Sequence, residues 1–272
     1  MGKYRKERGL NILYEIAERT KKRVDAQKDI LPLGKIIELA QGGGNNRFPF
    51  EDALRADDIA FICEIKKASP SKGVIAEDFP YLSIAKEYEA AGAAAISVLT
   101  EPFYFQGSDE YLREIAKTVS IPLLRKDFTV DAYMIYEAKV LGASAVLLIC
   151  SILDSDTLAE YISIAQGIGL SALVETHDEY EVDMALKAGA KIIGVNNRNL
   201  KTFEIDTATS VRLKKYVPED VIFVSESGIQ TPEDVEKLRE IKADAVLIGE
   251  AIMKSPDKRG EILRLRGVQF NG

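Results

Sequence analysis

The sequence predicts an α/β fold, a (β/α)8 (TIM) barrel with an extra N-terminal helical segment. Two observations support this: short runs rich in Val, Ile and Leu recur along the chain, and amphipathic stretches separate them. Parallel neighbouring strands need a crossover segment, and strands covered on both faces are almost continuously apolar. The eight runs are Ala60–Lys66, Ala94–Thr100, Pro122–Lys126, Ala145–Ile149, Ala172–Glu175, Ile192–Asn196, Val221–Glu226 and Ala245–Gly249.

Helices are expected between these runs. Several end in glycine just before the next run, as at Gly92, Gly142 and Gly189, where glycine serves as a helix C-cap. The number of runs and the chain length favour the barrel. A doubly wound open sheet is the alternative, and it fits less well because no GxGxxG motif follows the first run. The expected helices are Tyr81–Ala91, Asp131–Leu141, Thr157–Gly167, Asp178–Ala188 and Pro232–Ile241.

The first part of the chain has a different pattern. Residues 8–24 show helical spacing, with four apolar side chains on one side: Leu10, Leu13, Ile16 and Ala17. The stretch Gln41–Arg47, which contains GGGNN, is typical of a loop or hinge. We therefore expect a single domain over residues 1–272, with a helical extension at 1–50 and the barrel at 58–268.

Composition narrows the class of protein. The 272 residues include 36 basic and 43 acidic ones, a net charge of -7, which argues against non-specific binding to nucleic acid or anionic membranes. Cys63 and Cys150 lie in separate apolar runs and form neither a disulfide framework nor metal-ligand spacing, so a cytoplasmic location is expected. The start MGKYRKERGL lacks the apolar core of a signal peptide, and no apolar stretch reaches the ~18 residues of a membrane helix.

Charged residues stand where several predicted strands end. The two-residue period of a strand places Glu64 and Lys66 on one face, pointing into the mouth of the barrel. Lys126 and Glu175 point the same way, because each lies two residues after an inward leucine. Barrel active sites form at these strand ends, and clustered amines and carboxylates tune one another's pKa values for acid–base catalysis. The alternative is a purely structural ring of salt bridges.

Small residues follow the last two strands. Ser227-Gly228 and Gly249-Glu250 come directly after neighbouring runs. Barrels often bind a phosphate group there through backbone N–H groups, which glycine lets come close to the anion. The alternative is that these glycines merely turn the chain.

Aromatic residues and one histidine follow other strands. His177, the single histidine, lies near Glu175 but has no evident partner in the sequence, so we do not expect it to act as a base. No cluster of His, Cys and carboxylate residues has metal-ligand spacing, so no metal site is expected. The aromatic residues expected in loops above the rim, where they pack or hold a flat substrate ring, are Phe103, Tyr104, Phe105 and Phe128.

Longer motifs add a family resemblance. In order over roughly residues 50–255 the chain contains "EIKKASPSKG", "SVLTEPFYFQGS", "LLRKDF", "LLICSIL", "LVETHD", "IIGVNNRNLKTFEID", "VSESGI" and "VLIGEAIM". With these motifs it resembles the indole-3-glycerol phosphate synthases, and its N-terminal helices resemble the segment that caps the barrel mouth in that family. The resemblance implies a carboxy-lyase of tryptophan biosynthesis. Its substrate would be 1-(2-carboxyphenylamino)-1-deoxy-D-ribulose 5-phosphate, which is closed, decarboxylated and dehydrated to indole-3-glycerol phosphate, CO2 and water.

The resemblance also implies catalytic roles. Lys126 in "RKDF" would be the general acid for ring closure, and Glu175 in "LVETHD" its acid–base partner. Glu64 and Lys66 in "EIKK" would share this work, with their division between closure and dehydration left open. Asn196 would orient the substrate as part of the same group.

Other positions are implied to bind the substrate. Arg198 and Ser227 would orient it, with Glu226 beside Ser227 in "ESG". Some relatives carry Ser or Thr at Glu250, so its backbone N–H is expected to bind phosphate while the carboxylate turns away. The implied phosphate region is Lys66, Ser69, Gly228, Gly249 and Glu250, and the implied anthranilate pocket is Phe105, Phe128, Leu147 and Leu200.

The implied chemistry needs no metal or redox cofactor, because the bonds break by proton transfer and loss of CO2. The implied partner is a small phosphosugar–anthranilate substrate, with neither nucleic acid nor membrane. The sequence leaves open whether the chain works as a monomer or beside other pathway enzymes. Two alternatives remain: another phosphosugar barrel, such as an isomerase or a Schiff-base aldolase using Lys126, and a non-catalytic relative that only binds phosphate ligands.

Overall fold

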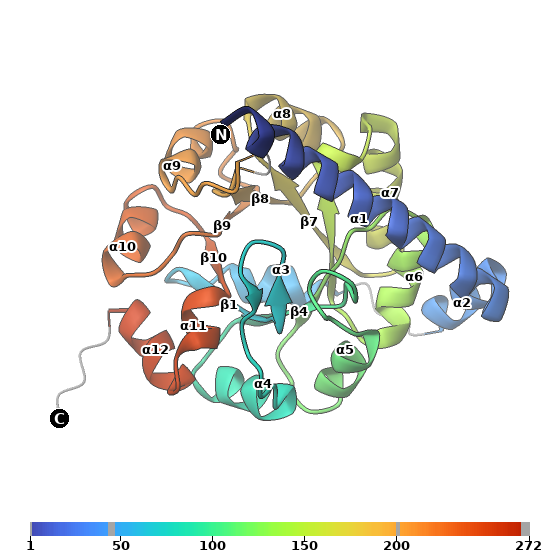
Figure 1. Cartoon of the computed structure of the whole chain (residues 1–272), viewed down its shortest axis with the longest axis horizontal. Helices are drawn as coiled ribbons and strands as arrows, with labels where there is room; N and C mark the ends of the chain where they lie inside the picture. The colour runs from blue at the N-terminus through green and yellow to red at the C-terminus, as the bar shows by residue number, and fades with distance from the viewer. Residues whose placement is uncertain (1, 43–46, 200–201, 268–272) are drawn as a thin grey trace.

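Parallel strands close into a barrel in the computed structural model, which describes residues 2–42, 47–199 and 202–267, with side chains from residue 12 onward (Figure 1). Each strand pairs with the next along the barrel, and β10 pairs with β1 to close it. The (β/α)8 barrel is confirmed, and all eight predicted runs form its strands: β1 (Ala60–Ile65), β4 (Ala95–Leu99), β5 (Leu123–Lys126), β6 (Ala145–Ile149), β7 (Ser171–Thr176), β8 (Ile192–Asn196), β9 (Ile222–Glu226) and β10 (Ala245–Ile248).

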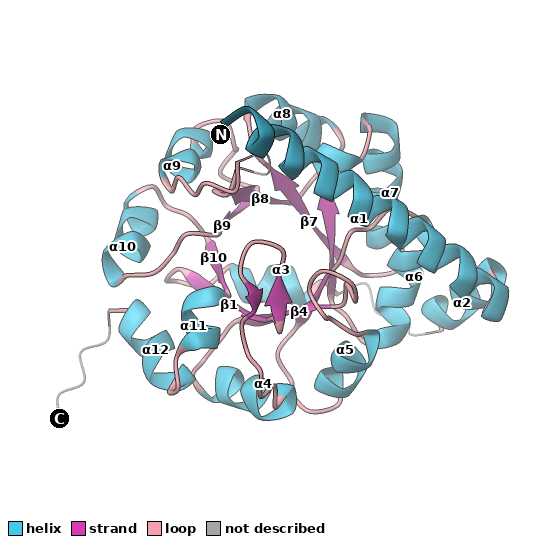
Figure 2. Cartoon of the chain, in the orientation of Figure 1, coloured by secondary structure: helices cyan, strands magenta, loops and turns pink. Residues whose placement is uncertain are grey.

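Helices surround the barrel (Figure 2). Their N-termini are capped by side chains such as those of Asp131 and Asp178, which accept hydrogen bonds from backbone N–H groups of the first turn. Gly142 ends one of them in the left-handed conformation, with φ 93°, as expected for a C-cap glycine. The five predicted helices are present: α4 (Tyr81–Ala90), α6 (Ala132–Leu141), α7 (Ser155–Gly167), α8 (Glu179–Lys187) and α10 (Pro232–Glu240).

Other helices were predicted incompletely or not at all. The first helix, α1 (Gly2–Ile30), is longer than the predicted 8–24, because its polar ends carry no apolar stripe. The predicted loop at 41–47 begins where α2 ends, and residues 43–46 lie outside the described part of the chain. The helix α2 (Leu33–Gln41) belongs to the predicted helical extension. The elements that were not predicted span eight residues or fewer: α3 (Pro49–Leu54), α5 (Asp109–Ala116), α9 (Ala208–Lys214), α11 (Glu250–Lys254), α12 (Lys258–Leu265) and the 3-10 turn η1 (Cys150–Ile152).

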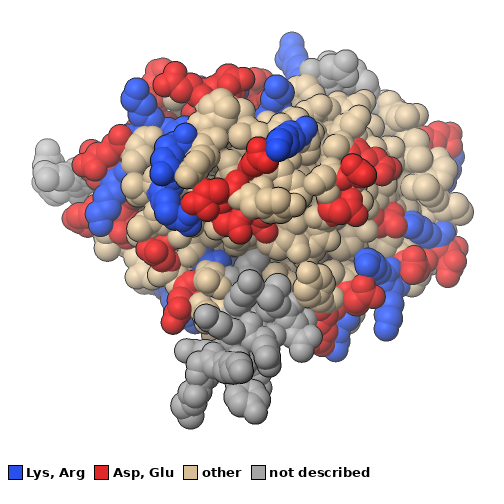
Figure 3. Space-filling view, turned by 90° about the horizontal axis from the view of Figure 1, so that it is seen from above, with Lys and Arg blue, Asp and Glu red and all other residues tan. Residues whose placement is uncertain are grey.

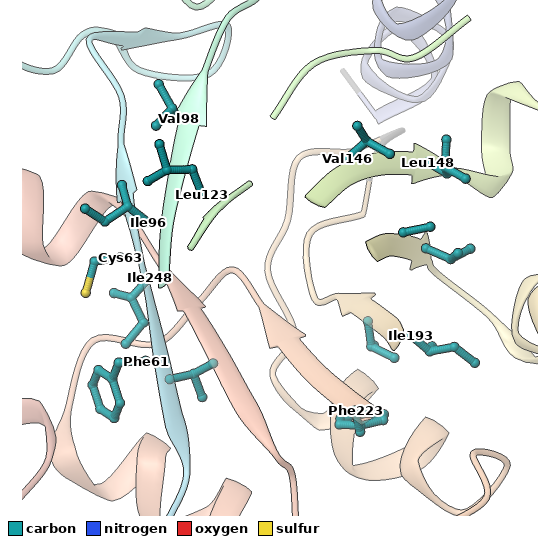
Figure 4. Packing of buried hydrophobic residues seen from close by; sticks show 14 of the residues in the cluster. Phe61, Cys63, Ile96, Val98, Leu123, Val146, Leu148, Ile193, Phe223 and Ile248 are labelled. Atoms are coloured by element: carbon teal, nitrogen blue, oxygen red, sulfur yellow. The ribbon is translucent and has the colours of Figure 1, made fainter. Parts of the chain in front are cut away.

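Two apolar clusters follow from the alternation of side chains along each strand. On β1, Phe61 and Cys63 point outward and pack between the barrel wall and the helices, in the cluster that Figure 4 shows. Ala60 and Ile62 belong to a second cluster inside the barrel. The same inward face carries Glu64 at the end of the strand. The two-residue alternation of side chains along β1 therefore places both the inner core residues and the charged residue of the pocket.

Segments that precede the barrel lie at its two ends. Phe50 and Leu54 of α3 are fully buried and join the inner cluster, so this short helix fills the end of the barrel opposite to the mouth. Leu13 and Ile16 of α1 belong to the same cluster but also line the pocket at the mouth. In Figure 1, α1 runs across the barrel from α8 toward α6.

A small hairpin that was not predicted follows β1. It pairs β2 (Ala68–Ser69) with β3 (Gly73–Val74) and brings Pro70 and Ser71 to the pocket. The N–H of Ala68 donates to the carbonyl of Phe105 at 3.2 Å. This bond ties the loop after β1 to the loop after β4.

Basic and acidic side chains are interspersed on the face seen in Figure 3, without a continuous basic field. Among the described residues, no helix is both long and apolar enough to cross a membrane.

Candidate active site

A pocket opens at the C-terminal ends of the strands, between the barrel and α1. It is lined by residues from all eight barrel strands and from the loops that follow them. The candidate Leu200 lies outside the described residues. Phe103 and Tyr104 do not line the pocket and instead contact Arg19 of α1. The other candidates come together here: Glu64, Lys66, Ser69, Phe105, Lys126, Phe128, Leu147, Glu175, Asn196, Arg198, Glu226, Ser227, Gly228, Gly249 and Glu250.

Lys126 lies between two buried carboxylates. Its Nζ is 3.1 Å from Glu175 Oε2 and 3.2 Å from Glu226 Oε2. Burial alone would lower the pKa of Lys126, but Glu226, Glu175 and Glu64 together raise it above its usual range. Burial likewise favours a neutral Glu175, yet Lys126 and His177 hold its pKa well below the usual range. This part of the site is therefore an ammonium–carboxylate pair.

Glu226 differs from Glu175 although both face the same amine. Burial, helped by the negative charge of Glu175, raises the pKa of Glu226 to about 7 against the opposing effect of Lys126. Its Oε1 is buried and has no hydrogen-bond partner among the residues that the structure describes. A Cβ on Gly194 of β8 would lie 2.1 Å from that oxygen, so only glycine leaves room for the carboxyl group. The two carboxyl groups thus have different protonation states near neutral pH.

Glu64 and Lys66 form an ion pair within the pocket, through Oε1 and Nζ. Glu64 is 6% exposed and Lys66 is 17% exposed. A Cβ on Gly249 would lie 2.5 Å from Glu64 Oε1, so this glycine also makes room for a carboxylate. The end of β1 can carry two charged side chains because they pair with each other at the point where the strand leaves the apolar interior.

Asn196 and Arg198 continue the polar wall beyond β8. The backbone N–H of Arg198 donates to Asn196 Oδ1 at 3.0 Å, and its Nη1 donates to the carbonyl of Phe203 at 3.3 Å. Asn196 also contacts Glu175 through its side chain, which contributes to the low pKa of that carboxyl group. Burial lowers the pKa of Arg198.

A strained turn follows β9. Ser227 has φ 66° and Gly228 has φ 87°, and a Cβ on Gly228 would meet Ile205 Cγ2 at 2.5 Å. A non-glycine residue with positive φ costs free energy and often marks a functional site. The amide of buried Asn197 donates to the carbonyl of Ser227 at 3.0 Å and holds the turn in place.

Gly249 and Glu250 begin α11 beside this turn. The carboxylate of Glu250 pairs with Lys254 at 2.7 Å and lies 3.6 Å from Lys72 Nζ. Because both partners are lysines, the negative charge of Glu250 is compensated at the polar end of the pocket.

An apolar region lines the opposite part of the pocket. The rings of Phe105 and Phe128 have centroids 6.2 Å apart, and Leu147 lies beside them in the inner cluster. Leu13 and Ile16 of α1 add to the same region. The loop that carries Phe105 is fixed by buried Glu101, whose carboxylate accepts the backbone N–H groups of Phe103, Tyr104 and Phe105 at 2.7 to 3.0 Å.

His177 has two partners in the structure, where the sequence showed no evident one. Its Nε2 lies 3.4 Å from Glu175 Oε1, and its Nδ1 lies 2.9 Å from Glu181 Oε2. Glu181 lies in the first turn of α8, and its carboxylate reaches back to the imidazole of His177, which precedes the helix.

The contact that fixes α1 was also missed. Arg23 of α1 donates to Asp127 Oδ2 at 2.7 Å, and Asp127 directly follows Lys126. Asp127 is fully buried and also accepts from Thr100 Oγ1 at 2.7 Å. No sequence spacing predicts a pair separated by 104 residues. In the described part of the chain, no group of His, Cys, Asp and Glu residues could hold a metal ion.

The fold and the site together define an enzyme of the (β/α)8-barrel class with a lysine–carboxylate site at the mouth of the barrel. The sequence model of indole-3-glycerol phosphate synthase matches residues 13–265. The chain belongs to the indole-3-glycerol phosphate synthase family. Its activity is that of this family, a carboxy-lyase reaction of tryptophan biosynthesis.

Individual relatives support this membership over nearly the whole chain. The indole-3-glycerol phosphate synthase of Ruminiclostridium cellulolyticum is 58% identical over 257 residues, which cover 94% of this chain and 99% of the relative. That of Endomicrobium trichonymphae is 54% identical over 249 residues, which cover 90% and 95%. Among solved structures, 3-hexulose-6-phosphate synthase from Salmonella typhimurium has a TM-score of 0.63 at 16% identity, over 77% of this chain and 98% of that chain, which shows the shared fold.

Proposed function

We propose that the pocket performs the family's reaction by proton transfer, with Lys126 as the general acid and Glu175 as its acid–base partner. The observation that carries this proposal is the position of Lys126 Nζ, within 3.2 Å of both Glu175 and Glu226. An ammonium group has three N–H donors. Two face these carboxylates, and the third is free to donate to a substrate carbonyl.

The steps balance without any other reactant. The ring carbon that bears the carboxylate bonds to the substrate carbonyl carbon, and the carbonyl oxygen takes a proton from Lys126. CO2 then leaves, and the electron pair of its bond restores the aromatic ring. The new hydroxyl group leaves as water after it is protonated, while a base removes a proton from the adjacent carbon. Glu175, Glu64 and Lys66 share these last transfers.

The two ends of the pocket match the two ends of the substrate. We place the phosphate at Ser69, Ser227, Gly228 and Gly249, which line the pocket together with Lys66 and whose backbone N–H groups would bind it. Glu250 would contribute its N–H, its own charge being paired with lysines. The anthranilate ring would lie between Phe105, Phe128 and Leu147, with Leu200 as a further candidate. Asn196, Arg198 and Glu226 would orient the chain between them.

The wider setting is part of the same proposal. We propose one domain in which residues 1–50 cap the mouth of the barrel at 58–268. Two buried free cysteines support a cytoplasmic location. The net charge of -7 argues against a nucleic-acid partner. Membership of the family supports a small-molecule substrate.

The test is turnover of the carboxyphenylamino-deoxyribulose phosphate, followed by indole fluorescence with a chelator and no added cofactor. The wild-type chain should produce indole-3-glycerol phosphate. Lys126→Ala should lower kcat by roughly 10²- to 10⁴-fold, as expected for loss of a general acid. Product binding, measured by calorimetry, should persist because the phosphate contacts remain.

Lys187→Ala is the matched control, since this lysine pairs with Asp183 on the surface of α8. It should leave turnover unchanged. Normal turnover in Lys126→Ala would contradict the assignment. Trapping of Lys126 by borohydride in the presence of substrate would point instead to Schiff-base chemistry.

A further inference from the structure

His177 lies behind the pocket and does not line it. It is the single histidine of the chain and belongs to the connection between β7 and α8. Its side chain is 15% exposed. Any influence on the reaction must therefore act through a neighbouring group, and that neighbour is Glu175.

Both ring nitrogens of His177 face carboxylates. Nε2 is 3.4 Å from Glu175 Oε1, and Nδ1 is 2.9 Å from Glu181 Oε2. A neutral imidazole has only one N–H, so it would leave one carboxylate facing a lone pair. The doubly protonated ring can donate from Nδ1 to Glu181 and places its positive charge 3.4 Å from Glu175, which is an ion-pair contact rather than a hydrogen bond. In agreement, Glu175 and Glu181 outweigh burial and raise the pKa of His177 to about 10.

Glu181 is itself held in place. Its Oε2 accepts the backbone N–H of His177 at 2.8 Å, and its Oε1 accepts the hydroxyl of Ser151 at 2.6 Å. Its backbone N–H donates to the N-cap residue Asp178 at 2.9 Å. Cys150 of η1 lies near the same carboxylates, and burial together with their charge raises the pKa of its thiol, so it stays neutral. The position of His177 is therefore fixed by Glu181, which is itself held by three hydrogen bonds.

The two oxygens of Glu175 therefore have different partners. Oε2 faces Lys126 at 3.1 Å in the pocket, and Oε1 faces His177 behind it. A carboxylate held at both oxygens cannot rotate without losing a contact. The second cation also favours the ionised form of Glu175.

We propose that His177, as an imidazolium held by Glu181, is a positioning residue that fixes the carboxylate of Glu175 toward Lys126 and the substrate. This inference rests on the proposed role of Glu175. It gives "LVETHDEYE" one physical meaning: the strand delivers the reacting carboxylate, and the first turn of α8 supplies the support for its orienting cation.

The charge state of His177 can be measured directly, because the chain has one histidine. Protein produced with 15N-labelled histidine and without a histidine tag should show an imidazolium at pH 8 by NMR. Glu181→Gln should lower the pKa of this ring, since one of its two carboxylates is lost. A neutral ring at pH 8 in the wild-type protein would overturn the inference.

Kinetics test the effect on catalysis. His177→Gln should lower kcat by roughly 10- to 100-fold, by analogy with the loss seen when a group that orients a metal-binding side chain is removed. KM should hardly change, because His177 does not line the pocket. The acid limb of the pH–rate profile should move to higher pH, since Glu175 loses a neighbouring cation. Glu181→Gln should shift it in the same direction by less.

Glu179→Gln is the matched control on α8, because Glu179 pairs with Arg212 at the surface. It should leave both kcat and the pH profile unchanged. If His177→Gln lowers only the melting temperature, His177 is structural and the inference fails. If Glu175→Gln itself keeps normal turnover, the proposed role of Glu175 fails instead, so the two failures can be told apart.

Discussion

Buried charges at the strand ends depend on one another. Cations and carboxyl groups alternate in space here, in the order Glu226, Lys126, Glu175 and His177, and the two carboxyl groups are more deeply buried than the two cations. Such a group keeps its charge only while its partner is present, so their protonation contributes to folding stability. Among these groups, the large upward shift in the pKa of His177 is the one that falls in a pH range where unfolding can be measured.

This gives a prediction for stability against pH. The folded pKa of His177, about 10, lies above the unfolded value of about 6.5. Its contribution is therefore complete below about pH 6.5 and is lost as the pH rises through about 10. Between pH 7 and 8.5 the free energy of unfolding should fall by up to about 1.4 kcal/mol per pH unit from this group.

Urea unfolding at several pH values checks this slope. Glu226, whose raised pKa of about 7 lies above its unfolded value, also makes stability fall with rising pH until the group is fully ionised, so the slope of His177 is read from about pH 8 upward. His177→Gln should flatten the curve over this range. An equal slope in the variant would show that other groups account for it.

At the scale of elements, the strands supply space as well as side chains. Gly194 lies in β8 against the carboxyl group of Glu226 from β9, and Gly249 directly follows β10 and lies against Glu64 from β1. In each case a glycine on or just after one strand leaves room for an acid on the neighbouring strand. The close packing of strands therefore limits which positions can hold a charged group.

Gly194→Ala tests this. A Cβ at 2.1 Å from Glu226 Oε1 forces the carboxyl group away from Lys126. We expect a loss of about 1–3 kcal/mol in stability from overpacking. Turnover should also fall at temperatures where the variant is fully folded. Denaturant unfolding and steady-state kinetics measure the two effects.

Gly167→Ala provides the comparison. Gly167 ends α7, and no atom lies within 4 Å of a Cβ built there. This variant should be as stable as the wild type or more stable by roughly 0.5–1 kcal/mol, because alanine favours a helix. If the two substitutions change stability equally, the close contact between a Cβ at residue 194 and Glu226 is not what destabilises the protein.

The whole molecule joins a barrel to a preceding helix, and one point of attachment of this helix lies next to Lys126. Arg23 of α1 contacts Asp127, and Lys28 pairs with Asp131 at 2.6 Å. Behind Asp127, Arg125 is fully buried and contacts Asp109 and Glu137 at 2.8 Å each. The polar network therefore extends from α1 through β5 to α5 and α6, and the helix position is linked to that of Lys126.

Arg23→Ala should loosen this attachment. Buried Asp127 loses one cation but keeps Arg125 at 3.7 Å and Thr100, so we expect a loss of roughly 1–3 kcal/mol in stability. KM should rise, since Leu13 and Ile16 on the same helix line the pocket. Lys21→Ala, which breaks an exposed pair with Glu18, should change neither value measurably. An unchanged KM in Arg23→Ala would show that α1 is held by its apolar contacts alone.

The sequence by itself determined the barrel and the composition of its mouth. Strand periodicity placed Glu64, Lys66, Lys126 and Glu175 on the inner face, and the structure brings them together there. Such patterns are local, because the direction of a side chain on a strand follows from its neighbours two residues away. The family motifs added the reaction, which periodicity cannot supply.

Only the tertiary structure decided which charges meet. The contact of Lys126 with Glu226 spans separate strands, Arg23 finds Asp127 across 104 residues, and His177 gains a second carboxylate behind the first. These contacts depend on the registration of strands and on how α1 lies over the mouth. The protonation of each group follows from burial and from charges that are distant in sequence, so the chain must fold before its acid–base properties exist.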